Sequence, residues 1–207
     1  MRNLLFLLLA MLQLPLFSQS ADEANVVLDK ALAVLKADAP VCMDYTYRVI
    51  DEDGELLQDD KGIIYMDGNR YALLMQDMKV WCDGVAQWSY MREVDEVYVT
   101  DAASDEAQSL SPVYIMEHYR AGRSVSLVHK GDVAVVELRS LTDVAAEVVK
   151  LHIRKSGNRL VAISINMPGQ GGVEVQLDGY TANCGAGGDV FVCPLGEFST
   201  AEVIDMR

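Results

Sequence analysis

The chain has 207 residues, a formal net charge of −14 at pH 7 and a composition that is 51% hydrophobic. Such an acidic chain repels phosphate groups, which argues against nucleic-acid binding and against docking on an anionic membrane by charge alone. The length suits one domain with a sizeable core.

The first 20 residues have the features of a secretory signal peptide. A short positive start, residues 1–3, precedes an almost wholly apolar run over residues 4–17, and Ser18-Gln19-Ser20 is a small-x-small cleavage pattern. The apolar run is too short to span a membrane, and no later segment approaches the ~20 apolar residues of a spanning helix. We therefore expect a signal peptide over residues 1–20, one domain over residues 21–207, and an exported, soluble protein.

The mature chain is predicted to begin with a helix over residues 21–37. Apolar residues recur there at helical spacing, and Pro40 ends the pattern. From residue 41 the apolar residues alternate with polar ones, which is typical of strands, and Asp-Gly turns separate the runs. The strands predicted in this part cover residues 41–49, 62–66, 70–75, 80–82, 85–91 and 94–100.

A second helix is predicted over residues 112–119, since Ser111-Pro112 fits an N-cap followed by proline at the first helical position. Strands are then predicted over residues 124–129, 133–138, 148–155, 159–167 and 173–177, with a further short helix over residues 142–147. The pattern indicates a large, strongly curved antiparallel sheet with two or three helices.

Four cysteines stand in the mature chain, and an even count in an exported protein permits disulfides. Cys184 and Cys193 are close in sequence across a glycine-rich loop, which favours a bond between them and leaves Cys42 to pair with Cys82. Four half-buried free thiols remain the alternative. No CxxC motif is present, so neither a zinc site nor a redox pair is indicated.

The sequence carries no catalytic signature. The three histidines, His118, His129 and His152, have no second histidine or cysteine at ligand spacing, and no GxSxG, HExxH, P-loop or GxGxxG motif occurs. We expect no catalytic residue, no metal and no cofactor, and we expect a protein that is not an enzyme.

A curved sheet with an apolar face and few helices to cover it leaves a concavity. Methionines fall on or beside these apolar faces, and methionine is adaptable enough to be over-used in promiscuous apolar sites. Methionines that only fill gaps in a core are the alternative explanation. The ones concerned are Met43, Met75, Met78, Met116 and Met167.

An ordered set of motifs in this chain resembles the periplasmic outer-membrane lipoprotein carrier family, LolA. Asp83-Gly84 followed by Trp88 and Tyr90 is similar to the D-G-x-x-x-W-x-Y hairpin of that family. Glu96-Val97 is similar to its next strand, Ser111-Pro112 to the start of its middle helix, and Asp205-Met206-Arg207 to its D-x-R end. The resemblance covers essentially the whole mature chain.

The resemblance implies an incomplete antiparallel β-barrel with helices as a lid over a hydrophobic cavity. It also implies a monomeric carrier that performs no bond chemistry. Its cargo would be triacylated lipoproteins, received from an inner-membrane lipoprotein-releasing ABC transporter and handed to an outer-membrane acceptor. Two alternatives remain open: a carrier or sensor of the same fold for a different lipid or amphiphile, and a closed interaction domain without a ligand.

The predicted cavity residues combine the apolar faces of the strands and helices. The resemblance also points to a lid lock, since the family often has an Arg-Pro pair just before its third strand. The corresponding stretch here, Met66-Asp67-Gly68-Asn69-Arg70, departs from that pattern, because it has no proline and its arginine is a few positions displaced. Arg70 is the lid-lock candidate, and an ordinary surface arginine is the alternative. The predicted cavity residues are Leu28, Leu32, Tyr45, Tyr47, Tyr71, Leu73, Met75, Trp88, Tyr90, Ile115, Met116, Ile163 and Ile165.

Overall fold

The computed structural model of the chain describes residues 16–104, 107–108, 112–118, 120–143 and 145–207. Its elements are mostly strands, joined by short turns, with two α-helices and two 3₁₀ helices (η) among the bounded elements. In chain order they are α1 (Leu16–Ala37), β1 (Val41–Ile50), β2 (Leu56–Asp67), β3 (Arg70–Met75), β4 (Met78–Cys82), β5 (Ala86–Met91), β6 (Glu96–Asp101), α3 (Pro112–His118), β7 (Arg123–Lys130), β8 (Val133–Ser140), β9 (Val148–Arg154), β10 (Arg159–Met167), β11 (Gly171–Thr181), η1 (Gly188–Phe191), η2 (Leu195–Phe198) and β12 (Glu202–Asp205).

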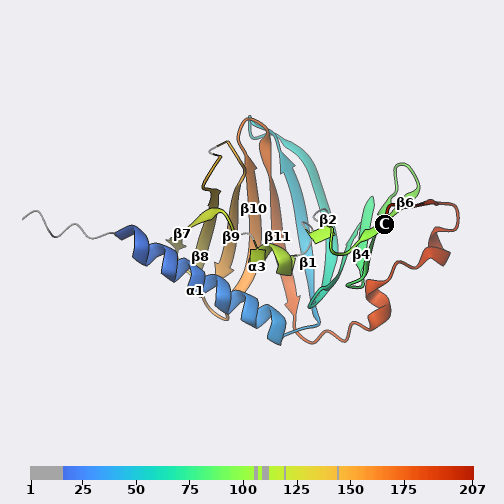
Figure 1. Cartoon of the computed structure of the whole chain (residues 1–207), viewed down its shortest axis with the longest axis horizontal. Coiled ribbons are helices and arrows are strands. Elements are labelled where there is room, and N and C mark those ends of the chain that lie inside the picture. The colour runs from blue at the N-terminus through green and yellow to red at the C-terminus, as the bar shows by residue number, and fades with distance from the viewer. Residues whose placement is uncertain (1–15, 105–106, 109–111, 119, 144) are drawn as a thin grey trace, which may run out of the picture.

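All twelve strands of the described residues belong to one curved sheet (Figure 1). Their order is β12-β6-β5-β4-β3-β2-β1-β11-β10-β9-β8-β7, and every neighbouring pair is antiparallel except β12 with β6. The sheet keeps two edges, β7 and β12, so it does not close into a barrel. The predicted mainly-β fold with an unclosed, curved sheet is confirmed.

The strand pattern in the sequence locates most of the sheet. On β9, the buried residues Val149, Leu151 and Ile153 alternate with the more exposed Lys150 and Arg154, because successive side chains of a strand point to opposite faces. The bounds of β3 and β10 are those predicted, whereas β2 and β11 are longer than predicted. Longer strands carry polar residues at their ends, where the sheet reaches into solvent and periodicity is weak.

The helices differ from the prediction in two places. Helix α1 ends at Ala37 as predicted but begins at Leu16, so residues 16–20 continue the helix, while residues 1–15 lie outside the described part of the chain. The helix predicted over residues 142–147 is wrong, since the described residues there form turns and bends. Side chains of Ser140 and Asp143 accept hydrogen bonds from nearby backbone N–H groups, which stabilises turns instead of a helix. The predicted N-cap, Ser111, lies outside the described residues.

Helices α1 and α3 lie on the same, concave face of the sheet (Figure 1). Buried residues recur on α1 at helical spacing, with Ala24, Leu28, Ala31 and Leu35 facing the sheet. The two helices are also joined to each other at the surface. Arg120, just beyond α3, donates to Asp29 of α1 at 2.6 Å, and Lys36 of α1 pairs with Glu117 of α3. The two helices thus form one connected cover.

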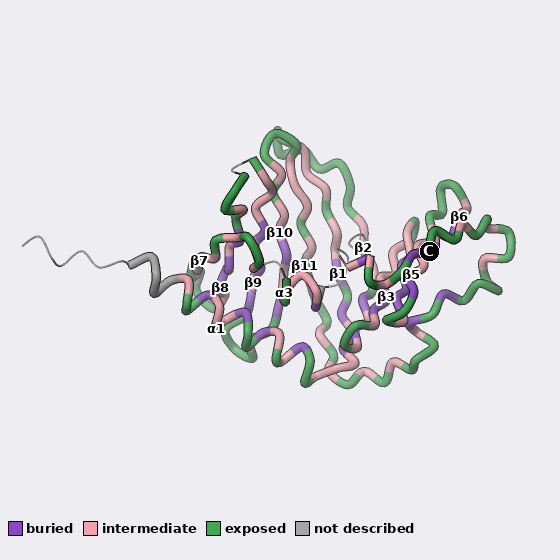
Figure 2. The backbone as a smooth tube through the Cα atoms, in the orientation of Figure 1, coloured by how far each residue is buried: buried purple, intermediate pink, exposed green. Residues whose placement is uncertain are grey.

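The sheet buries apolar side chains on both of its faces. The inner core lies between the concave face and the two helices, and an outer core lies on the opposite face of β3–β6. Figure 2 shows buried stretches both beside α1 and at the C-terminal end of the sheet. The outer core is covered by the C-terminal segment, residues 182–207, whose Phe198 ring lies 5.6 Å from Trp81 and 4.4 Å from Tyr90 between centroids.

Phe191 anchors this C-terminal segment. Its side chain is 0% exposed, and the guanidinium of Arg70 lies 4.9 Å above its ring. We expect Phe191→Leu to lower the free energy of unfolding by about 1–2 kcal/mol, because ring carbons are lost from a packed site. Chemical denaturation measures this, and Val192→Ala, at an exposed neighbour, should change stability by less than about 0.5 kcal/mol. Equal effects of the two substitutions would contradict the anchoring role.

The disulfide in the structure is not the one predicted. Cys42 of β1 bonds Cys184, with their Cα atoms 5.9 Å apart, while Cys82 and Cys193 are free and buried. Cys42 of β1 pairs with Thr181 at the end of β11, and Cys184 lies three positions further along the chain. Strand pairing therefore brings the two cysteines together although 142 positions separate them in sequence. The chain then crosses to the outer core, where burial and nearby Glu197 raise the pKa of the Cys193 thiol to about 11. Closeness in sequence was therefore the wrong guide to the pairing.

Candidate functional site

An apolar pocket of about 300 Å³ lies between the concave face of the sheet and the two-helix cover. Its walls come from β1–β4, β10 and β11, and its roof from α1 and α3. Seven of the predicted cavity residues line it. They are Tyr45, Tyr47, Leu73, Met75, Ile115, Ile163 and Ile165.

Strand register explains why these side chains meet. Tyr45 of β1 stands opposite Gly62 of β2, and Gly62 stands opposite Met75 of β3. Residues directly opposite each other in antiparallel strands point to the same face, so this row faces the pocket. The same alternation places Leu73 beside Ile64 on the pocket side and turns Ile63 outward.

Four predicted residues pack in the inner core without lining the pocket. Leu28, Leu32 and Met116 hold the helices to the sheet. Tyr71 is buried beyond the pocket, and its hydroxyl lies 2.5 Å from Gln87 Oε1 and 2.7 Å from the Ala107 carbonyl oxygen. Its burial, together with the neighbouring Cys82, raises the pKa of Tyr71, so the phenol remains a neutral hydrogen-bonding group.

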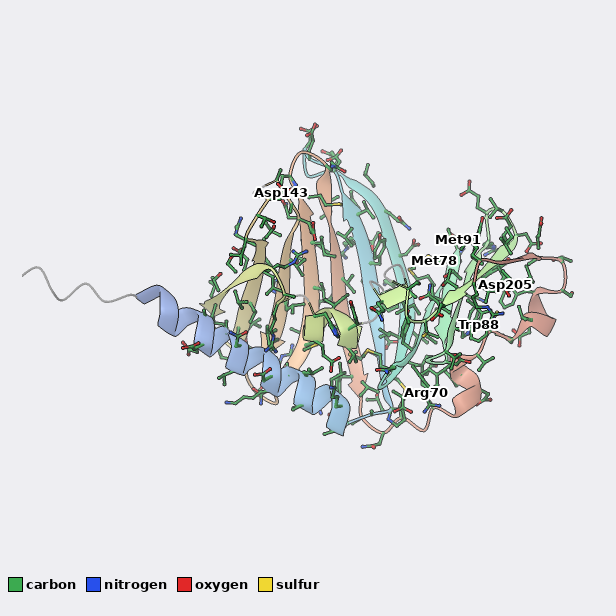
Figure 3. All side chains as sticks on the ribbon, viewed as in Figure 1. Arg70, Met78, Trp88, Met91, Asp143 and Asp205 are labelled. Atoms are coloured by element: carbon green, nitrogen blue, oxygen red, sulfur yellow. A yellow bond between two sulfur atoms is a disulfide. The ribbon has the colours of Figure 1, made fainter. Side chains whose placement is uncertain are left out.

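Trp88 and Tyr90 do not face the concavity, and their predicted orientation is wrong. They share one face of β5, as predicted, but this is the outer face, where Trp88 pairs with Trp81 and packs against the outer core. Figure 3 shows Trp88 near the C-terminal segment. On β5 the concave face is occupied instead by Gln87 and Ser89. Because the C-terminal segment covers the outer face, large aromatic residues are buried there as well.

Arg70 lies beside the C-terminal segment (Figure 3). Its guanidinium pairs with Asp67 and lies above the Phe191 ring. These contacts join β3 to η1 on the outer side of the molecule. The lid-lock role of Arg70 stays a prediction.

A polar cluster at the pocket rim was not predicted from the sequence. Arg159 and Tyr180 line the pocket, and Tyr180 donates from its hydroxyl to Asp38 at 2.9 Å. Arg159 lies 4.2 Å above the Tyr180 ring and 3.8 Å from the Asp38 carboxylate. The cluster ties the end of α1 to β10 and β11. Asp38 is more than 100 positions from both Arg159 and Tyr180 in the chain, so no local pattern could have identified the cluster.

The methionine prediction is partly reproduced in the pocket. Met43, Met75 and Met78 line it, and so does Met66, which was not singled out. Met116 is buried in the inner core, and Met167 lies away from the pocket near the end of β10. Apart from Arg159 and three tyrosines, the lining is apolar, so the pocket is suited to hydrocarbon groups.

Two properties of the described residues bear on other kinds of site. No group of three or more His, Cys, Asp or Glu side chains in this part of the chain is placed to hold a metal ion. None of the described helices combines the length and the hydrophobicity needed to cross a bilayer.

Several solved structures are similar to this chain at low sequence identity. MucB is 11% identical with a TM-score of 0.50, over 88% of this chain and 66% of that one. A LolA superfamily protein from Nitrosomonas europaea is 10% identical with a TM-score of 0.43, over 82% and 97%. Lipoprotein LppX from Mycobacterium tuberculosis is 10% identical with a TM-score of 0.42, over 78% and 97%. At these identities the similarity concerns the fold alone.

The family assignment comes from the sequence match. No curated protein matches the chain at a significant level. The family described as outer membrane lipoprotein carrier protein LolA matches residues 14–156, which is more than half of the chain. The chain belongs to the LolA family of outer membrane lipoprotein carrier proteins.

Proposed function

We propose that this protein is a carrier that shields the acyl chains of lipoproteins in its pocket and delivers them across the periplasm to the outer membrane. The observation that carries the proposal is the apolar pocket under a two-helix cover, in a chain of the LolA family. The function proposed for the pocket is binding and release.

The physical reason for such a carrier is the cost of exposing acyl chains to water. Each CH₂ group removed from water contributes about 0.8 kcal/mol, so a lipid anchor does not leave a membrane without an apolar container. An empty container that stayed open would expose a large apolar patch and would tend to aggregate. A cover made by α1 and α3 avoids this exposure when no cargo is present.

The proposal includes the route of the protein and its partners. Residues 1–20 would direct export and be removed, which leaves residues 21–207 as a periplasmic carrier domain. The cargo would come from an inner-membrane lipoprotein-releasing ABC transporter and pass to an outer-membrane acceptor. The acidic surface suits a protein that must not adsorb to anionic membranes while it carries lipid.

Loading requires the cover to move. A volume of about 300 Å³ is at the lower end of the range for ligand pockets, so an anchor with three chains needs a wider pocket. One end of the cover is fixed near the sheet, because Asp38 bonds Tyr180 and the Cys42–Cys184 disulfide lies beside it. Opening would therefore separate α3 and the body of α1 from the sheet around this fixed end.

A second candidate is a carrier or sensor for a different lipid or amphiphile. It is favoured by the sequence before β3, which lacks the Arg-Pro pair of the family, and by the contacts of Arg70 with Asp67 and Phe191. The pocket itself suits either candidate, since hydrocarbon chains are common to both kinds of ligand.

The proposal is tested by mixing the purified protein with a triacylated lipoprotein in detergent and then removing the detergent. We expect a soluble 1:1 complex on size-exclusion chromatography, whereas the lipoprotein alone should aggregate. The same lipoprotein without its acyl chains is the control and should elute separately from the protein. Aggregation of the acylated form in the presence of the protein, while a simple diacyl lipid still binds, would favour the second candidate.

A further inference from the structure

Tyr45 carries a polar group that the fold leaves unpaired at the pocket. The residue is only 6% exposed, and its hydroxyl oxygen exposes less than 1 Å² with no hydrogen-bond partner among the described residues. An unsatisfied buried hydroxyl normally costs free energy, so most buried phenols have a partner. Tyr71, the other strongly buried tyrosine of the inner core, has such partners. Tyr45 is the exception.

Gly62 makes room for this ring. A Cβ atom at Gly62 would lie 2.8 Å from Cζ of Tyr45, the carbon that bears the hydroxyl, so the tyrosine ring extends across β2 at the position without a side chain. Gly62 also stands opposite Met75, which lines the pocket. The hydroxyl end of Tyr45 thus lies over β2 on the concave face of the sheet. A side chain at position 62 would displace the Tyr45 ring.

The phenol is in the correct state to donate. Burial, followed by the negative charge of Asp60, raises the pKa of Tyr45, so the hydroxyl keeps its proton. A donor inside an apolar site strongly favours a ligand that presents an acceptor within an otherwise apolar body, because a ligand without one leaves the donor unpaired. An acyl chain joined to its head group by an ester or amide carbonyl has this character, and a plain alkyl chain does not.

We propose that Tyr45 is a specificity-determining residue that donates its hydroxyl proton in a hydrogen bond to the linkage carbonyl of an acyl lipid. The inference rests on the proposed function and deepens it, since it names acyl carbonyl lipids as the ligand class. Binding would require a small shift of the ring or of its neighbours to bring the carbonyl oxygen to within about 2.8 Å of the hydroxyl. Tyr65 of β2 is partly buried against the outer core, on the opposite face of the sheet, so it provides a matched control outside the pocket.

The test compares dioctanoylglycerol, which has ester carbonyls, with dioctylglycerol, its ether analogue, by calorimetric titration below their micellar concentrations. We expect the wild-type protein to bind the ester about fivefold to tenfold more tightly. Tyr45→Phe should reduce this ratio to less than about twofold by weakening the binding of the ester alone, and Tyr65→Phe should preserve it. Without ligand, the Tyr45→Phe variant should also melt at a higher temperature than the wild-type protein, because the unpaired hydroxyl group is removed.

The outcomes separate this inference from the proposed function. Equal wild-type affinities for the two compounds, or an ester preference that survives in Tyr45→Phe, would overturn the role of Tyr45 and leave the carrier function standing. Loss of the preference in Tyr65→Phe as well would also overturn it. Failure of the wild type to bind either compound would contradict the carrier function itself.

Discussion

Leu73→Glu should abolish the retention of acyl ligands. Leu73 lies on β3 with its side chain in the pocket, opposite Ile64 on β2 and Val80 on β4. A carboxylate there would either remain charged in an apolar site or draw water into it, and both outcomes remove the gain from burying hydrocarbon. We expect the affinity for dioctanoylglycerol, measured by calorimetric titration, to fall more than ~100-fold, which corresponds to about 2.7 kcal/mol.

Ile63→Glu is the matched control. Ile63 is adjacent to the pocket-lining Ile64 on the same strand, but its side chain points to the outer face and is 40% exposed. The same new charge should therefore leave the affinity within about twofold of the wild type. Circular dichroism and thermal melting should be used to check that both variants fold. Retention of ligand by a folded Leu73→Glu variant would show that the acyl chains do not occupy this pocket.

Loss of the Cys42–Cys184 disulfide should cause the largest change in stability. The bond closes a loop of 142 residues between β1 and the segment after β11. A cross-link over so long a loop restricts the unfolded chain strongly, and its removal typically costs about 2–5 kcal/mol. We expect Cys42→Ala to melt roughly 5–15 °C below the wild type, on the scale of about 2–4 °C per kcal/mol for a chain of this size.

The free cysteines provide the control for this prediction. Reductant should lower the melting temperature of the wild type and of Cys193→Ala, whose replaced thiol lies in the outer core, but should not affect Cys42→Ala. Non-reducing peptide mapping should recover a peptide that links Cys42 to Cys184. A linked Cys184–Cys193 peptide would contradict the assignment of the bond.

The positions of β3 and β10 were predictable because each has an apolar face that is buried or partly buried. β3 and β10 have the predicted bounds, since their alternation is uninterrupted and turns flank them. The inward direction of β1 was also predictable, because Tyr45 and Tyr47 alternate with polar residues. The orientation of β5 was not, because its outer face is buried as well and Trp88 suits either face. Periodicity shows which residues share a face but does not show what covers it.

Contacts between distant segments were the other limit. β12 pairs with β6 in parallel, which joins residues 106 positions apart such as Glu96 and Glu202, and the C-terminal segment covers the outer core. The rim cluster of Asp38, Arg159 and Tyr180 and the disulfide from Cys42 to Cys184 depend on the same kind of contact. Each is set by the order of strands in the sheet, which local sequence patterns do not determine.

Native mass spectrometry of the protein isolated from its native cells tests the central claim most directly. The account predicts a fraction of the protein carrying one triacylated lipoprotein, and dissociation in the gas phase should release a peptide with acyl chains. The Leu73→Glu variant prepared in parallel should lack this species, while Ile63→Glu should keep it. Wild-type protein that shows only its own mass, even after gentle cross-linking in the cells, would contradict the claim that it carries acylated cargo.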